Sequence, residues 1–334
     1  MREKTERREQ MFLSEFATKS VDTKGRERYE EKCPFRTDFQ RDRDRIIYSK
    51  AFRRLKNKTQ VFFSPEGDHY RTRLTHTLDV SQVARSIARG LDLNEDLAEA
   101  IALGHDLGHT PFGHSGEAVL NRLSPHGFKH NEQSLRVVDV LENDGKGLNL
   151  TFEVRDGIVN HKKTGNPATL EGQAVSIADR IAYLNHDIED AMSAGLIKSV
   201  DELPSETRIL GSCSSERINA MITSIIRTSE NKPFVRMEDE IRSATETLRD
   251  FMFQHVYLTK EARGEEDRAD RMLSTMYAYF TEDLNRLPDL YKPLLEKYDK
   301  ETVVCDYISG MTDRYAISVF ESIFVPKSFL IKHQ

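Results

Sequence analysis

The fold is organised around Gly104-His105-Asp106-Leu107-Gly108-His109-Thr110-Pro111-Phe112-Gly113-His114-Ser115-Gly116-Glu117. This stretch holds three His, one Asp and one Glu in fourteen residues, although the whole chain has only 11 His. An apolar helical pattern runs into the stretch, and a proline and several glycines break the chain within it. Titratable groups held on a bent backbone between two helices indicate a functional site, for which the rest of the chain supplies partners.

The flanking sequence is helical in pattern on both sides of this stretch. Val80, Val83, Ile87 and Leu91 recur at helical spacing, and Asn94 is a suitable N-cap for the next helix. The pattern predicts an all-α fold, with at most a small β-hairpin near residues 60–70 and a charged turn at residues 264–268. We expect helices over residues 1–20, 41–58, 77–91, 95–107, 115–123, 131–142, 151–161, 171–195, 215–229 and 234–258.

The composition is that of a charge-rich globular protein. The chain has 334 residues, of which 38% are hydrophobic and 31% charged, and no apolar run approaches the ~20 residues of a membrane helix. The first residues lack the apolar core of a secretory signal. The three Cys are scattered, which fits a reducing cytoplasm and gives no thiolate metal site. We therefore expect a cytoplasmic protein with no membrane partner.

Charge is distributed unevenly along the chain. Residues 1–60 contain 18 Lys and Arg against 11 Asp and Glu, a net charge of +7, whereas the whole chain carries −6. A positive N-terminal segment on an acidic body suggests a phosphate-bearing ligand or a subunit contact. A solvated charged helix explains the same asymmetry equally well.

The residue types around the central stretch suit a divalent metal ion with nitrogen and oxygen ligands, such as Mn, Fe, Zn or Mg. His105 and Asp106 are adjacent at a helix end, and His76 lies at the start of an earlier helix. The helix at 171–195 carries Asp179, and its polar stripe continues at i+4 and i+8. Spacing alone leaves two alternatives for this stripe, metal ligation or ion pairs between helices.

The pattern His76, His105-Asp106 and Asp179, with the extended motif between them, resembles the HD-domain phosphohydrolases. Within these it is most similar to the deoxynucleoside triphosphate triphosphohydrolases, the dGTPase and dGTPase-like proteins of bacteria. The similarity covers about residues 41–195, and a second stretch, Asp306-Tyr307-Ile308-Ser309-Gly310-Met311-Thr312-Asp313-Arg314-Tyr315, resembles the C-terminal part of the same proteins. The resemblance implies an HD-domain helical bundle over residues 61–195. A basic helical segment, 1–60, precedes it, and a helical region, 196–334, packs on it.

The resemblance also implies site residues. The implied metal ligands are His76, His105, Asp106 and Asp179. The implied catalytic residues are His114, Glu117 and His109, and the sequence does not decide whether His114 is a general acid or activates water. The implied substrate contacts are Arg73, Arg180 and His130 near the phosphates, and Gln60, Tyr183 and Asp187 at the sugar. His161 reads as a cation favoured at a helix end and is left out of the predicted site.

The implied activity is metal-dependent hydrolysis of a dNTP to deoxynucleoside and tripolyphosphate, by water attack at the α-phosphorus. The implied cofactor is one divalent ion, with Mn favoured over Fe, Mg or Zn. The implied partners are a dNTP substrate, a dNTP activator and further copies of the chain, commonly in a hexamer. Two alternatives stay open: an HD phosphohydrolase for another nucleotide, or a weakly catalytic regulatory oligomer that binds nucleotides or single-stranded nucleic acid.

Overall fold

The structure of the protein, a computed structural model, describes residues 1–60, 71–257 and 260–326. Every named element in those ranges is a helix, as the sequence predicts, and extended pairing there consists of isolated antiparallel bridges. One bridge joins Thr59 to Thr72, on either side of the predicted hairpin, which itself lies outside the described residues. No helix in the described part of the chain has the length and apolar character needed to cross a membrane.

The α-helices of the described ranges are α1 (Arg2–Phe12), α2 (Asp38–Tyr48), α3 (Lys50–Arg54), α4 (Arg73–Gly90), α5 (Glu95–Gly104), α6 (Gly113–Leu123), α7 (His130–Arg136), α8 (Glu142–Gly145), α9 (Phe152–Asn160), α10 (Leu170–Ser193), α11 (Ser214–Ser229), α12 (Asp239–Met252), α13 (Lys260–Glu282), α14 (Lys300–Ser309) and α15 (Asp313–Phe324).

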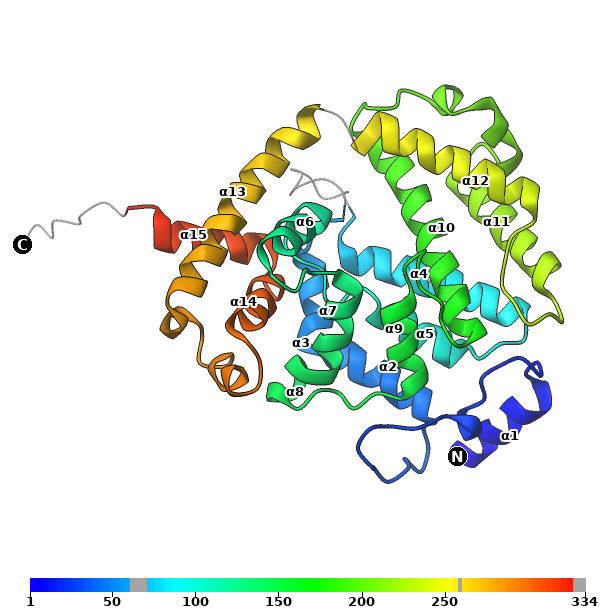
Figure 1. The fold of residues 1–334 in the computed structure, drawn as a ribbon. Helices are drawn as coiled ribbons and strands as arrows, with labels where there is room; N and C mark the ends of the chain where they lie inside the picture. The colour runs from blue at the N-terminus through cyan, green and yellow to red at the C-terminus, as the bar shows by residue number, and fades with distance from the viewer. Residues whose placement is uncertain (61–70, 258–259, 327–334) are drawn as a thin grey trace, which may run out of the picture.

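Helix α10 is the central element, and α4, α5 and α9 pack directly against it (Figure 1). Its apolar side is buried at Val175, Ala178, Ile181 and Ala182, and it forms the larger hydrophobic core together with residues of α2, α4, α5 and α9. The polar stripe of α10 lies beside this apolar side. Because the two sides share one helix, the core fixes the position of Asp179.

Helix α4 begins at Arg73, four residues earlier than the expected start at residue 77. The cause is a capping box, in which the side chains of Thr72 and Thr75 each accept a hydrogen bond from the other residue's backbone N–H. The earlier start places Arg73 and His76 one turn apart on the same helix, where both are buried. The predicted N-cap Asn94 is confirmed, since its side chain accepts from the backbone N–H groups of Asp96 and Leu97.

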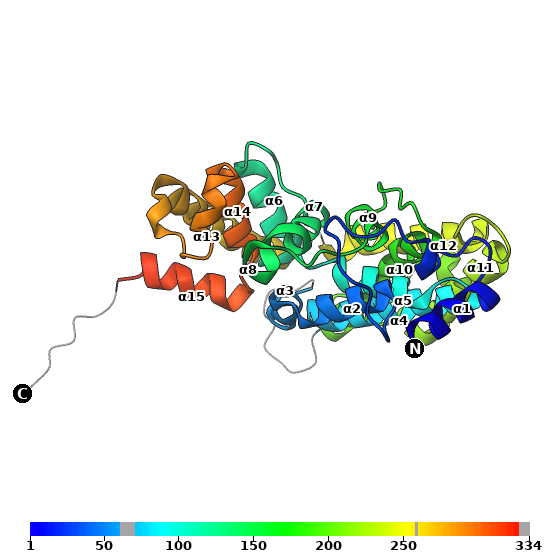
Figure 2. The ribbon, with the colours of Figure 1, turned by 90° about the horizontal axis from the view of Figure 1, so that it is seen from below.

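Residues 196–326 divide into two groups that lie on opposite sides of the central helices (Figures 1 and 2). Helices α11 and α12 pack against α10 and extend the larger core. Helices α13, α14 and α15 instead form a second hydrophobic core with α6. The C-terminal group therefore reaches the helix that follows the central motif. The boundaries predicted at residues 60 and 195 stay predictions.

The charged turn predicted at residues 264–268 is wrong, because these residues lie inside helix α13. Gly264 suggested the turn, but a single glycine costs a helix only about 1 kcal/mol. The residues after it, Glu265 to Arg268, include good helix formers, and Arg268 pairs with Glu265 at 2.8 Å.

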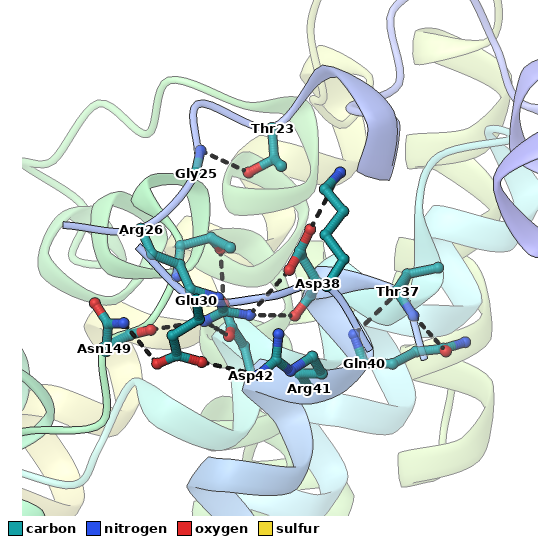
Figure 3. A network of polar contacts seen from close by, with 12 residues as sticks. Thr23, Gly25, Arg26, Glu30, Thr37, Asp38, Gln40, Arg41, Asp42 and Asn149 are labelled. Carbon is teal, nitrogen blue, oxygen red and sulfur yellow. Dashed lines mark hydrogen bonds and ion pairs between the residues drawn. The ribbon is translucent and has the colours of Figure 1, made fainter. Parts of the chain in front are cut away.

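A partly buried polar network connects residues 26–30 to α2 (Figure 3). Arg26 donates to the carboxylate of Asp42, which also accepts from the backbone N–H and the hydroxyl of Thr151, both at 2.7 Å. Arg41 and Arg45 both pair with Glu30. Part of the positive charge of residues 1–60 is therefore neutralised inside the chain.

Candidate metal centre and active site

The structure brings the four predicted metal ligands together from α4, the end of α5 and α10. Nε2 of His76 lies 3.1 Å from Oδ1 of Asp179. Nε2 of His105 lies 3.7 Å from the same oxygen and 3.5 Å from Oδ1 of Asp106. One ligand atom each from His76, His105 and Asp106 lies within 4.8 Å of the other two, close enough for all three to bind one metal ion.

The surroundings of His105 favour a proton or a metal ion at its Nε2. Nδ1 of His105 lies 2.6 Å from the carbonyl oxygen of Ala102, so Nδ1 carries the proton and donates it. On a neutral ring Nε2 would then carry a lone pair, and this atom is buried without a hydrogen-bond partner. Two carboxylates face this lone pair, and such an arrangement of acceptors is repulsive unless a proton or a metal ion lies between them. Imidazole nitrogen and carboxylate oxygen suit Mn, Fe, Zn or Mg.

The electrostatics of the cluster agree with this interpretation. Burial alone would lower the pKa of His105, but the carboxylates of Asp106 and Asp179 raise that pKa to about 9. Burial likewise opposes ionisation of Asp106, yet His109, His105 and Arg73 hold the pKa of Asp106 well below its usual range. Without metal, the site therefore combines the ionised carboxylates of Asp106 and Asp179 with a His105 ring that is protonated on both nitrogens.

Metal uptake by this cluster at pH 7 is expected to release about one proton per bound ion. The metal-free protein keeps the His105 proton up to pH about 9, whereas the ion needs the Nε2 lone pair. The release should therefore be present below pH 9 and fade as the pH rises above it. Titration calorimetry with Mn²⁺ in two buffers of different ionisation enthalpy measures it, and a buffer-independent enthalpy at pH 7 would contradict the assignment.

Arg73 and His109 lie against the metal-ligand cluster. Nη1 of Arg73 donates to Oδ2 of Asp106 at 2.8 Å, and this arginine is 2% exposed. Nε2 of His109 lies 3.3 Å from Oδ1 of Asp106. Burial and the charge of Arg73 lower the pKa of His109 well below its usual value.

Glu117 and His130 form a second polar cluster beside the first. Oε2 of Glu117 accepts from Nδ1 of His130 at 2.8 Å, and Oε1 accepts from the backbone N–H of the same residue at 3.1 Å. Nδ1 of His114 lies 3.6 Å from Oε2, and the His114 side chain is 73% exposed. Burial would raise the pKa of Glu117, but hydrogen bonds from His114 and His130 hold it well below its usual range. An ionised carboxylate thus lies between a buried imidazole and an accessible one.

The sequence prediction omitted His161, and the structure places it between the two clusters. Its Nε2 lies 3.3 Å from Nε2 of His130, and its ring lies edge-on to that of His105 at 5.0 Å. Its Nδ1 donates to the carbonyl of Ile158, so His161 is fixed by α9. Burial and the neighbouring His105 lower its pKa to about 4. The position of His161 at a helix end was the available sequence signal, and a favourable helix dipole explained it equally well.

The backbone between the two clusters has an unusual conformation. Phe112 and Gly113 both have positive φ, 61° and 56°. For a bulky residue such as Phe112 this costs about 1–3 kcal/mol and persists only where the surroundings enforce it. Gly108 is required for a different reason, since a Cβ there would lie 2.2 Å from the backbone nitrogen of Ser134.

The predicted substrate residues are spread around the clusters. The main chain of Gln60 lies near Gly113, since its carbonyl is 3.5 Å from the position of an added Cβ on that glycine. Asp187 is 1% exposed on α10, two turns after Asp179. Tyr183 and Arg180 line a cavity of about 220 Å³ between α10 and α12. The Nε of Arg180 donates to the carbonyl of Ser176, so this group is directed along α10 and not toward the metal ligands.

Comparison with known proteins gives consistent matches. The HD domain family matches residues 73–184, and the phosphohydrolase-associated domain matches residues 235–322. A deoxyguanosinetriphosphate triphosphohydrolase-like protein of Caldanaerobacter subterraneus subsp. tengcongensis is 57% identical over 326 residues, covering 98% of this chain and 96% of that protein. A protein of the same description from Clostridium tetani is 47% identical, with coverage of 98% and 97%. A solved phosphohydrolase from Bacteroides thetaiotaomicron shares the fold, with a TM-score of 0.53 at 19% identity, over 84% of this chain and 68% of that one.

Proposed function

This chain belongs to the HD-domain phosphohydrolases of the deoxyguanosinetriphosphate triphosphohydrolase-like family, and from that premise we propose that it hydrolyses deoxynucleoside triphosphates. The reaction is dNTP plus water to deoxynucleoside plus tripolyphosphate. Water oxygen bonds to the α-phosphorus, the Pα–O5′ bond breaks, and a proton goes to O5′. The observation that supports this most is the juxtaposition of the metal-ligand cluster with the His114, Glu117 and His130 cluster.

His76, His105, Asp106 and Asp179 would hold a divalent ion, with Mn the favoured candidate, and such an ion would supply Lewis-acid chemistry at the phosphate and lower the pKa of water. Arg73, which donates to Asp106, adds positive charge next to the metal ligands and balances part of the phosphate charge. Lys162, whose Nζ lies 3.6 Å from Glu117, adds a cation on the other side of the second cluster. Several cations suit a triphosphate better than a monophosphate.

The second cluster supplies the proton chemistry. His114 is the one imidazole of the cluster that is open to solvent, so it is the one that a substrate oxygen can reach. The carboxylate of Glu117 lies 3.6 Å from Nδ1 of His114 and orients the ring through its charge, while His130 fixes Glu117 through two hydrogen bonds. We assign to His114 the donation of a proton to the leaving O5′, because that alkoxide is strongly basic.

Purified protein with Mn²⁺ is expected to release deoxynucleoside and tripolyphosphate in equal amounts from at least one dNTP. The reaction is measured by chromatography after incubation with each dNTP singly and in pairs, which also shows whether one dNTP activates hydrolysis of another. A nucleoside monophosphate as substrate is the control for the rival HD phosphohydrolase activity. Release of orthophosphate from the monophosphate, with no hydrolysis of any dNTP, would favour the rival.

A further inference from the structure

The C-terminal stretch 306–315 has no role in the chemistry above, yet it lies against the central motif. It covers the end of α14, the connection Gly310-Met311-Thr312 and the start of α15. Two of its acidic side chains are buried, Asp306 at 0% and Asp313 at 2% exposure. Asp306 pairs with Arg136 of α7 through two bonds of 2.7 Å, which is a structural ion pair. Asp313 has different partners.

The carboxylate of Asp313 binds two separate segments at once. Its Oδ1 accepts from the backbone N–H of Phe112 at 3.1 Å, at the residue with positive φ that precedes α6. Its Oδ2 accepts from the backbone N–H of Thr59 at 2.9 Å and from the Thr59 hydroxyl. Thr59 immediately precedes Gln60. One buried carboxylate therefore joins the turn before His114 to Thr59, the neighbour of a predicted substrate residue.

A buried lysine, Lys58, also connects the turn before α6 to the C-terminal stretch. Lys58 is 2% exposed, and its Nζ donates to the carbonyl of His109 and, at 2.8 Å, to the carbonyl of Ser309. The turn at residues 109–113 is thus held at its beginning by Lys58 and at its end by Asp313. Both contacts also involve the junction of α14 and α15.

The turn needs such support from outside. Phe112 is the N-cap of α6, but its side chain makes no capping hydrogen bond, and a bulky residue with positive φ keeps that conformation only where its surroundings fix it. Helix α6 carries His114 and Glu117 on its first two turns. A change at the turn would move both side chains relative to the metal ligands, and a displacement of 1 Å at a reacting group costs about a hundredfold in rate.

We propose that Asp313, together with Lys58, is a positioning residue that fixes the 109–113 turn, and through it His114 and Glu117, for the reaction. The C-terminal helices thus contribute directly to the geometry of the active site. This inference rests on the proposed function for its effect on rate, whereas the fixation of the turn is independent of it.

The test compares Asp313→Asn with Asp42→Asn. Asn at position 313 keeps the shape and one acceptor oxygen, but its NH₂ group cannot accept from Thr59. Asp42 is the matched control, because it is fully buried and also accepts from a threonine backbone N–H and hydroxyl, in the N-terminal network of Figure 3. Rates with Mn²⁺ and a dNTP are measured per bound metal, and hydrogen–deuterium exchange is followed in peptides covering residues 109–117.

For Asp313→Asn we expect kcat to fall at least tenfold with KM within threefold, and exchange at residues 109–117 to become at least tenfold faster. Asp42→Asn should keep kcat within twofold and leave exchange at 109–117 unchanged. A folded Asp313→Ala variant should show a larger fall in kcat and faster exchange at residues 109–117 than Asp313→Asn. Wild-type exchange in Asp313→Asn, or faster exchange with unchanged kcat, would overturn the proposal. If the wild type hydrolyses no dNTP, the proposed function fails, and the exchange data alone decide whether Asp313 fixes the turn.

Discussion

Asp106→Ala and His105→Ala are each expected to abolish bound metal and to lower tripolyphosphate release at least a thousandfold. Both residues are buried, and their facing atoms, Nε2 of His105 and Oδ1 of Asp106, lie 3.5 Å apart. Removing either leaves three of the four predicted ligands, and removing Asp106 also removes negative charge that compensates the ion. Metal per chain is measured by elemental analysis, and product release by chromatography at saturating Mn²⁺.

Asp106→Ala also leaves Arg73 as an unpaired buried cation, which costs about 3–5 kcal/mol of stability. Asp306→Asn is the matched control, since Asp306 is an equally buried carboxylate paired with an arginine outside the metal cluster. The control should lose stability and keep its metal. Full metal occupancy in folded Asp106→Ala or His105→Ala would refute the ligand assignment.

Glu117→Gln is expected to lower kcat a hundredfold to a thousandfold while metal content and KM stay close to the wild-type values. The amide still accepts from the backbone N–H of His130, so the fold of the cluster is retained. The charge that orients His114 is lost, and general acid–base catalysis typically contributes 10²–10⁴-fold. Steady-state kinetics with the best dNTP substrate measure the effect.

Glu132→Gln serves as the control for this variant, because Glu132 is exposed on α7 and pairs only with Lys129 among the described residues. It should leave kcat unchanged. A Glu117→Gln enzyme with wild-type kcat would exclude Glu117 from the proton chemistry and would require another partner for His114.

The sequence predicted the helical fold, and the four residues that it indicated as metal ligands lie together in the structure, because both predictions depend on local or repeated signals. Amphipathic spacing identifies α4 and α10, and the ligand pattern is carried by an extended motif rather than by a dipeptide. The four predicted ligands converge in the structure because α10 packs against both α4 and α5. Whether these residues bind metal and turn over substrate stays a prediction for the experiments above.

What the sequence could not show depends on contacts between distant segments. His161 meets His130 across 31 positions of the chain, and Asp313 meets Phe112 across 201. In the sequence Lys58 is one of many basic residues in segment 1–60. Its burial and its two carbonyl partners are visible only in the structure. The division of residues 196–326 between two cores follows from packing against α10 and α6, which no local pattern encodes.

The central claim is tested most directly by phosphorus NMR of the reaction in water enriched in ¹⁸O, with Mn²⁺ and the preferred dNTP. Attack of water at the α-phosphorus with cleavage of the Pα–O5′ bond predicts intact tripolyphosphate with one ¹⁸O on a terminal phosphorus, and an unlabelled deoxynucleoside. Formation of pyrophosphate or orthophosphate as the first product, or ¹⁸O in the 5′-hydroxyl of the deoxynucleoside, would contradict it.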